Sequence, residues 1–262
     1  MKLSISNIGW TEENDRAVYE LMQNIGYEGL EVAPTRIFSQ MPYDRLEEAQ
    51  RWARTLKQDT GLIVPSTQSI WYGREEKIFG TEAERNILIG YTKKAIDFAS
   101  VIGCRNLVFG CPRNRNIVGE YNPDVAIGFF REIGDYAADK ETVIGMEANP
   151  PIYNTNYINN TKAALELIEQ VGSDGFKLNF DLGTVIYNEE DLSEIVGKVK
   201  LINHVHISEP GLKPIEKRSV HEELRRILVN EDYNGFVSIE MGKSNELTMI
   251  EDIMLYVKEI FS

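Results

Sequence analysis

The sequence predicts a single-domain α/β protein, a (β/α)8 TIM barrel that takes up residues 1–262. Short β-branched apolar segments recur along the chain, and each is followed by a stretch long enough for one helix and its loops. Such alternation builds a parallel sheet. A length near the ~250 residues of one barrel, and the lack of a glycine-rich phosphate loop after any strand, favour a closed barrel over an open nucleotide-binding sheet. The predicted strands are Lys2–Ser6, Gly29–Ala33, Leu62–Thr67, Asn106–Gly110, Val143–Glu147, Lys177–Asp181, Ile202–Ile207 and Phe236–Glu240.

Helices are predicted between the strands from apolar spacing and from capping residues. Thr81, with Glu84 three residues later, has the form of a capping box, and Pro123 suits the first position of a helix. Thr11 is expected to cap the first helix. The predicted helices cover residues 11–24, 44–60, 81–102, 123–140, 161–171, 189–196, 219–230 and 246–261.

Composition narrows the class of function. The formal net charge is −13, which disfavours binding to nucleic acid or to anionic membranes, because both need a basic surface. No apolar run reaches the ~20 residues of a membrane-spanning helix, and the N-terminus lacks a signal-peptide core, so we expect a cytoplasmic protein. The two cysteines, Cys104 and Cys111, are too few for a disulfide framework or a thiolate metal site and are expected to stay reduced.

Four of the predicted strands end at a residue that commonly binds metals. These residues are Glu147, Asp181, His206 and Glu240. In a parallel barrel the C-terminal ends of all strands lie on one face, and active sites are built there. One imidazole and three carboxylates on that face suit a divalent cation. We therefore predict that the four side chains converge on one metal ion.

Other polar and aromatic residues follow the strand ends on the same face. Arg113, Arg115 and Lys213 suit a phosphate or carboxylate of a substrate, although each could equally pair with an acidic neighbour. Trp71 could form a wall against a sugar ring or could pack within the protein. The predicted substrate-binding residues are Gln68, Trp71, Arg113, Arg115, Asn149, Glu209 and Lys213.

Two further residues have more than one open interpretation. His204 lies two residues before His206 and shares its face of the strand, so it points into the barrel one layer deeper. It is either a core histidine or a residue that supports the metal ligands from below. Glu31, at the end of the second strand, could take part in the site or form a salt bridge.

Five segments at the strand ends, at 109–115, 147–150, 179–181, 204–210 and 238–241, read FGCPRNR, EANP, NFD, HVHISEP and SIEM. They resemble the sugar-phosphate isomerase/epimerase group of xylose-isomerase-like barrels, and the resemblance extends over nearly the whole chain. It implies that Glu147, Asp181, His206 and Glu240 bind one divalent metal, often manganese, and that the two glutamates act as acid and base across the substrate. By analogy, Glu209 contacts a substrate hydroxyl or supports the metal site.

The leading hypothesis is a divalent-metal-dependent isomerase or epimerase of a small sugar, keto-sugar or polyol derivative. Glu147 and Glu240 would exchange a proton on opposite faces of an enediolate. The alternatives are a keto-polyol dehydratase of the inosose type on the same site and a sugar-binding barrel without catalysis. An apurinic endonuclease on this barrel is disfavoured, because its zinc cluster needs many histidines and the chain has three.

The expected cofactor is one divalent ion, with Mn²⁺ first and Mg²⁺, Co²⁺ and Zn²⁺ also open. The expected partner is a small-molecule sugar or keto-sugar, without nucleic acid or membrane. The sequence leaves open whether two barrels pair as a homodimer.

Overall fold

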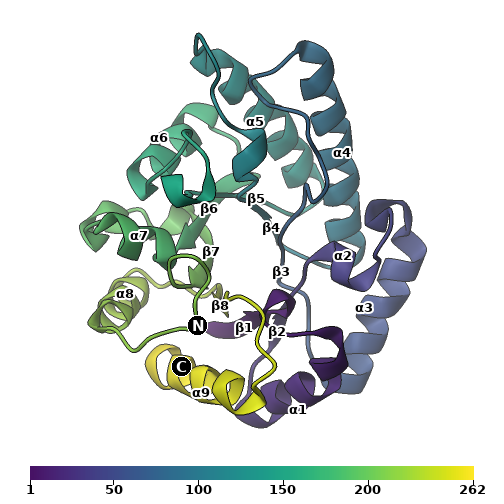
Figure 1. Cartoon of the computed structure of the whole chain (residues 1–262), viewed down its shortest axis with the longest axis vertical. Coiled ribbons are helices and arrows are strands. Elements are labelled where there is room, and N and C mark those ends of the chain that lie inside the picture. The colour runs from purple at the N-terminus through teal and green to yellow at the C-terminus, as the bar shows by residue number, and fades with distance from the viewer.

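Eight parallel strands form the centre of the molecule, and helices surround them (Figure 1). The computed structural model describes all residues, 1–262. The strands are β1 (Lys2–Ser6), β2 (Gly29–Glu31), β3 (Ser66–Thr67), β4 (Asn106–Phe109), β5 (Ile144–Glu147), β6 (Phe176–Asp181), β7 (Ile202–Ile207) and β8 (Phe236–Ile239). The predicted single-domain (β/α)8 barrel is confirmed.

The sheet closes through a short seam between its two outer strands. The strand order is β2-β1-β8-β7-β6-β5-β4-β3, and all neighbouring pairs are parallel. Single bridges between Gly29 and Ile63 and between Val32 and Thr67 connect the β2 side to the β3 side. The barrel is therefore complete, and every strand delivers its C-terminal end to the same rim.

The helices pack on the outside of the barrel through their apolar faces. In the longest helix, Leu88, Thr92, Ala95 and Ala99 are buried at spacings of three and four residues, as one face of a helix requires. The α-helices are α1 (Asp15–Ile25), α2 (Pro34–Ile37), α3 (Leu46–Thr60), α4 (Glu82–Val101), α5 (Pro123–Asp139), α6 (Thr161–Val171), α7 (Leu182–Asn188), α8 (Ser219–Asn230) and α9 (Leu247–Phe261). The 3₁₀ helices are η1 (Asn7–Gly9), η2 (Glu12–Asn14), η3 (Pro42–Asp44), η4 (Pro112–Asn114), η5 (Pro151–Tyr153), η6 (Leu192–Ile195) and η7 (Val199–Leu201).

Two local signals in the sequence are confirmed by the structure. The amide of Glu84 donates to Oγ1 of Thr81 at 3.2 Å, and the amide of Thr81 donates to Oε2 of Glu84 at 2.8 Å, which completes the capping box of α4. Pro123 is the first residue of α5, where its missing amide hydrogen costs no helical hydrogen bond. These two starts depend only on residues close in the chain.

The predicted helix over residues 189–196 is wrong. Helix α7 begins directly after β6, because the carboxylate of Asp181 accepts a hydrogen bond from the amide of Thr184 at 2.8 Å and caps the helix there. The helix ends at Asn188, since Glu189 adopts a left-handed φ of 54°. Only a short 3₁₀ helix lies within the predicted range. A candidate metal ligand also serves as a helix cap, which apolar spacing does not reveal.

Two other element boundaries differ from the prediction. The first α-helix starts at Asp15, and Thr11 does not cap it, because its hydroxyl donates instead to Oδ1 of Asn245 at 3.1 Å. Of the predicted strand 62–67, only the last two residues form β3. Pro65 directly before them has no amide hydrogen for a ladder, which limits the strand.

The interior of the barrel is polar. Side chains alternate along each strand, and the outward ones join the hydrophobic core beneath the helices. Inward positions instead carry buried serines, asparagines and histidines. Across this interior, Nδ2 of Asn106 donates to Oγ of Ser66 at 3.0 Å and to Oδ1 of Asn179 at 3.3 Å. A layer of polar groups thus lies directly below the rim.

The structure also bears on the state of the two cysteines and on membrane-spanning helices. Cys104 and Cys111 are both free, in agreement with the prediction. None of the helices combines the length and the apolar character that would let it span a bilayer.

Candidate metal centre

Four side chains from separate strands meet at the C-terminal rim. Glu147 ends β5, Asp181 ends β6, His206 lies near the end of β7, and Glu240 directly follows β8. Each offers one ligand atom, and these atoms lie within 4.8 Å of one another. The sheet register explains the convergence: Asp181 pairs with His206, and His206 pairs with Ser238, which shares its face with Glu240.

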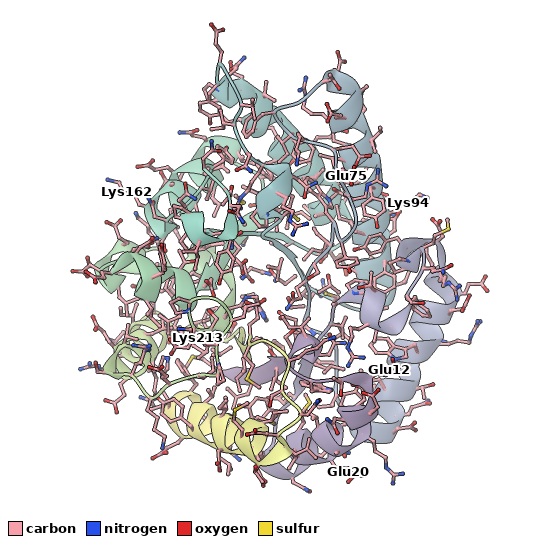
Figure 2. The ribbon with its side chains drawn as sticks, viewed as in Figure 1. Glu12, Glu20, Glu75, Lys94, Lys162 and Lys213 are labelled. Atoms are coloured by element: carbon pink, nitrogen blue, oxygen red, sulfur yellow. The ribbon has the colours of Figure 1, made fainter.

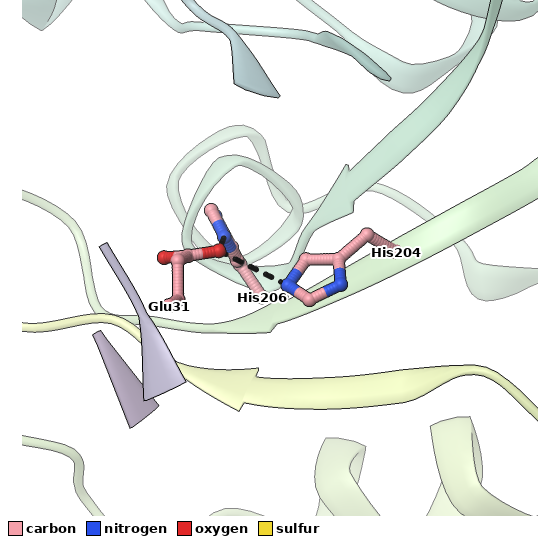
Figure 3. Close-up of side chains that lie close together, drawn as sticks. All are labelled: Glu31, His204 and His206. Atoms are coloured by element: carbon pink, nitrogen blue, oxygen red, sulfur yellow. Dashed lines mark hydrogen bonds and ion pairs between the residues drawn. The ribbon is translucent and has the colours of Figure 1, made fainter. Parts of the chain in front are cut away.

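The imidazole of His206 lies between carboxylates on both sides. Its Nδ1 faces the cluster, 3.0 Å from Oε1 of Glu147 and 3.4 Å from Oε2 of Glu240. Its Nε2 lies 2.9 Å from Oε2 of Glu31, the last residue of β2 (Figure 3). Because an ionised carboxylate only accepts hydrogen bonds, Nε2 carries a hydrogen. In the neutral ring this leaves the lone pair of Nδ1 for a cation.

His204 approaches the same carboxylate from one layer deeper. Figure 3 shows one oxygen of Glu31 pointing towards both histidine rings. Nε2 of His204 lies 3.1 Å from Oε2 of Glu31, although this nitrogen makes no well-oriented hydrogen bond. Burial lowers the pKa of His204, and the charge of Glu31 opposes that shift. His204 does not line the cavity at the rim; it lies beneath the cluster, against the carboxylate that holds His206.

Side-chain amides hold the two glutamates of the cluster. Glu147 accepts from Nδ2 of Asn179 at Oε1, at 2.9 Å, and from Nδ2 of Asn149 at Oε2, at 3.0 Å. Glu240 accepts from Nε2 of Gln68 at 3.0 Å. These neutral donors orient the carboxylates but leave their negative charge uncompensated.

Asp181 is held by hydroxyl groups and one backbone amide. Its Oδ2 accepts from the amide and from Oγ1 of Thr184, both at 2.8 Å, and its Oδ1 accepts from Oγ of Ser208. No lysine or arginine donates to Asp181, Glu147 or Glu240. The basic side chain that contacts carboxylates of this cluster is His206, which meets Glu147 and Glu240.

The electrostatics show a site that lacks positive charge. Burial raises the pKa of Glu240 to about 7. Burial, and then the charge of Glu147, raise the pKa of Asp181. Burial alone would lower the pKa of His206, but the carboxylates of Glu31, Glu240 and Glu147 outweigh it and hold that pKa well above its ordinary value. A divalent cation would supply the missing charge, so Glu147, Asp181, Nδ1 of His206 and Glu240 fit one such ion.

Glu31, His204 and His206 also lie close enough together to share a cation. A second ion there, beside one in the main cluster, would require both ring nitrogens of His206 to bind metal and the ring to lose its last hydrogen. A hydrogen bond from Nε2 to Glu31 is the simpler arrangement. It makes Glu31 a support of the metal centre.

A cavity of about 600 Å³ opens from the cluster to solvent. This volume lies within the range of small-molecule sites, roughly 300–1,000 Å³. Loops that follow β3, β4, β5 and β7 form most of its wall. The predicted site residues that line the cavity are Gln68, Trp71, Arg113, Glu147, Asn149, Asp181 and Glu240.

Arg115 does not line the cavity and is completely buried. Its guanidinium donates to the backbone oxygen of Glu147 at 2.8 Å and to Oδ1 of Asn149 at 2.9 Å. The second contact turns the amide of Asn149 so that its Nδ2 faces Oε2 of Glu147. The structure therefore places Arg115 behind the site, where it orients Asn149.

Glu209 and Lys213 also lie outside the cavity lining. Glu209 is 2% exposed, and both of its carboxylate oxygens accept hydrogen bonds from Arg218 at 2.8 Å. Lys213 is exposed on the loop after β7 (Figure 2).

Sequence reasoning missed residues that hold or flank the cluster. The sequence places Asn179 on the same face of β6 as Asp181, in the segment 179–181, but does not reveal that its amide holds Glu147. No sequence pattern indicates Thr184, because its contact with Asp181 depends on the start of α7 at Leu182. Tyr153 lines the cavity from η5, and no pattern around it in the sequence indicates this position.

Comparison with known proteins identifies the family of this barrel. The model of the xylose isomerase-like TIM barrel family matches residues 19–260. A solved structure of 3-keto-D-glucoside 4-epimerase from E. coli is 18% identical, with a TM-score of 0.76 over 99% of both chains. D-psicose 3-epimerase from Clostridium cellulolyticum H10, solved with D-tagatose, is 14% identical, with a TM-score of 0.80 over 100% of both chains.

A third similar structure is the probable 3-DHS dehydratase AsbF from Bacillus anthracis. It is 16% identical, with a TM-score of 0.69 over 99% of this chain and 98% of that one. At sequence identities of 14–18%, these structural similarities establish the fold alone. Among proteins with curated descriptions, none matches this chain. Because the family model spans most of the sequence, this chain belongs to the xylose isomerase-like TIM barrel family.

Proposed function

We propose that this protein is a divalent-metal-dependent isomerase or epimerase of a small sugar or keto-sugar. The placement of Glu147 and Glu240 carries the proposal. They come from strand ends separated by β6 and β7, both approach Nδ1 of His206, and both line the cavity. A flat substrate bound at this end of the cavity would meet one carboxylate on each face, as an acid–base pair requires.

The two glutamates have properties suited to moving a proton beside a carbonyl group. Burial raises the pKa of Glu240 to about 7, so near neutral pH it exists in both protonation states and can give or take a proton. The amides of Asn149 and Asn179 fix the orientation of Glu147. A divalent cation held by the cluster would supply positive charge for the negative charge that develops on the substrate oxygens.

The names of similar barrels support this class of reaction, since two of the three are sugar epimerases. The third is a dehydratase, and dehydration is the second candidate. It begins with the same removal of a proton, after which protonated Glu240 would assist the departure of a hydroxyl group. The two candidates therefore share a site and differ in their product.

Exchange of carbon-bound hydrogen in deuterated water tests the proposal. The protein loaded with Mn²⁺ is incubated with a panel of ketoses and keto-inositols, and the products are analysed by mass spectrometry. An isomerase or epimerase incorporates one deuterium without loss of water, whereas a dehydratase gives a product lighter by one water molecule.

Variants connect the exchange to the two glutamates. Glu147→Gln and Glu240→Gln should each lower the exchange rate by about 10²-fold or more. Glu222→Gln, on the exposed face of α8, is the control and should exchange at the wild-type rate. Wild-type exchange in both cluster variants would show that the glutamates are not the acid and base.

A further inference from the structure

The cavity is larger than a single free sugar needs. If each of the dozen non-hydrogen atoms of a hexose takes up at most the ~30 Å³ of a liquid water molecule, the sugar fills at most roughly 360 Å³. The cavity holds about 600 Å³. With one hexose at the metal centre, a substantial part of the cavity towards solvent remains for another group.

Three exposed residues of the cavity lining lie where it opens to solvent: Tyr72, Glu75 and Arg113. We call these three residues the outer wall. Tyr72 is 72% exposed although it lines the cavity, so one large aromatic ring faces solvent at the entrance. Tyr153 lines the same cavity nearer to the carboxylates of the cluster, and its hydroxyl oxygen accepts a hydrogen bond from the amide of Gly211 at 3.0 Å. Aromatic faces of this kind suit the apolar C–H face of a sugar ring.

Three of the loops that line the cavity contain turns in defined conformations. Ser69, Cys111 and Leu212 all line the cavity, and all have left-handed backbone conformations, with φ of 55°, 42° and 55°. Residues with side chains adopt this conformation at a cost, and they persist in it where the surrounding structure determines the turn. The backbone turns around the cavity are therefore set by the fold.

The charges on the outer wall favour an uncharged ligand. The side chains of Arg113 and Glu75 make no ion pair, so one free cation and one free anion face the same space (Figure 2 labels Glu75). Arg74, also in the lining, is neutralised by its contacts with Glu76. A phosphate would be attracted by Arg113 but repelled by Glu75 and by the carboxylates of the metal centre. A sugar hydroxyl both donates and accepts, so it can satisfy both groups.

From the volume, the aromatic faces and the balanced charge, we propose that the substrate is an uncharged, glycosidically extended keto-sugar. Its reacting ring lies at the metal centre, and its second ring lies against Tyr72 with hydroxyl groups near Arg113 and Glu75. The inference rests on the proposed function and adds the substrate class: a glycoside or disaccharide instead of a sugar phosphate.

Three compounds that differ at a single position test this. Fructose, fructose 6-phosphate and isomaltulose, which carries glucose on O6 of fructose, are titrated by calorimetry into the Mn²⁺-loaded protein. Isomaltulose should bind about five- to tenfold more tightly than fructose, the gain expected of one aromatic contact, and fructose 6-phosphate should bind no more tightly than fructose.

Substitution of Tyr72 connects the gain to the outer wall. Tyr72→Ala should remove the advantage of isomaltulose and leave the affinity for fructose unchanged. Tyr187→Ala is the matched control, since Tyr187 is also exposed, at 42%, but lies outside the cavity. It should keep the full advantage.

Other results would overturn the proposal. These are tightest binding of fructose 6-phosphate, no advantage of isomaltulose over fructose (including binding of neither), or an advantage that survives Tyr72→Ala. Binding and exchange also separate this inference from the proposed function. Preferential binding of isomaltulose without deuterium exchange would leave the outer wall as a binding site and remove the activity. Deuterium exchange into fructose without preferential binding of isomaltulose would support the proposed activity and contradict the outer wall as a binding site.

Discussion

Oε2 of Glu31 lies 2.9 Å from Nε2 of His206, and the two residues are 175 positions apart in the chain. Both side chains are completely buried. The contact fixes which ring nitrogen carries the hydrogen and turns Nδ1 towards Glu147 and Glu240. Burial would raise the pKa of Glu31, but His206 and His204 outweigh it and hold that pKa well below its usual value, so the carboxylate stays ionised.

Loss of the charge on Glu31 should weaken metal binding. In Glu31→Gln the side chain no longer carries the negative charge that orients His206 and raises its basicity. We expect an affinity for Mn²⁺ about 10- to 100-fold lower, measured by calorimetry. Glu209→Gln serves as the control, because Glu209 is equally buried but pairs with Arg218 away from the cluster. An unchanged affinity in Glu31→Gln would mean that His206 does not need this support.

Arg115 should contribute both to the stability of the fold and to the orientation of Asn149 beside Glu147. Arg115→Lys keeps a positive charge but cannot reach Glu147, Asn149 and Ile158 at once, as the guanidinium does. Leaving one or more buried acceptors without a donor should lower the free energy of unfolding by about 2 kcal/mol, measured with urea. Turnover should fall as well, since the amide of Asn149 is released.

Arg113 provides a matched comparison for that variant. It is exposed, its side chain has no ion-pair partner, and it lies only two residues away on the same loop. Arg113→Lys should change the free energy of unfolding by less than about 0.5 kcal/mol. Equal losses of unfolding free energy in Arg115→Lys and Arg113→Lys would contradict the assignment of Arg115 as a buried support and of Arg113 as an exposed residue of the outer wall.

Gly110 leaves the space that Glu147 occupies. A Cβ atom at position 110 would lie 2.9 Å from Oε2 of Glu147 and 3.4 Å from Oδ1 of Asn149. Gly110→Ala should therefore displace the carboxylate and lower both Mn²⁺ affinity and deuterium exchange. In Gly128→Ala on α5, nothing lies within 4 Å of the added atom, so the site should be unaffected and the helix stabilised by about 0.5–1 kcal/mol. Full activity in Gly110→Ala would show that Glu147 tolerates the shift.

Metal affinity should depend steeply on pH. Burial raises the pKa of Glu240 to about 7, and the pKa values of Asp181 and His206 are also raised, so protons occupy the cluster when no cation is bound. A cation must displace them. Affinity should therefore fall as pH falls, beginning above neutral pH through the raised pKa of His206 and more steeply below about 7 as Glu240 is also protonated, by up to tenfold per pH unit for each proton released.

Calorimetry in buffers of different ionisation enthalpy measures that proton release directly. Wild-type protein should release at least one proton per Mn²⁺ near pH 7, and Glu240→Gln, which has no carboxyl proton at that position, should release fewer. No proton release in the wild type would show that the cluster is already deprotonated.

Much of this protein follows from patterns local to the sequence. The alternation of strand and helix, the capping box at Thr81 and Pro123 at the start of α5 all depend on residues within a few positions of each other. The convergence of Glu147, Asp181 and His206 with Glu240 also follows, because parallel strands bring their C-terminal ends to one rim and period-two alternation keeps the side chains on the inner face.

Other features were decided only by the tertiary structure. Arg115 is buried behind the cavity and orients Asn149, Glu31 supports His206, and α7 starts at the residue after Asp181. Each of these depends on which polar groups from distant strands are buried side by side. A buried donor or acceptor needs a hydrogen-bond partner within about 3 Å. In a closed barrel that partner comes from another strand or loop, so its identity depends on three-dimensional packing and not on spacing along the chain.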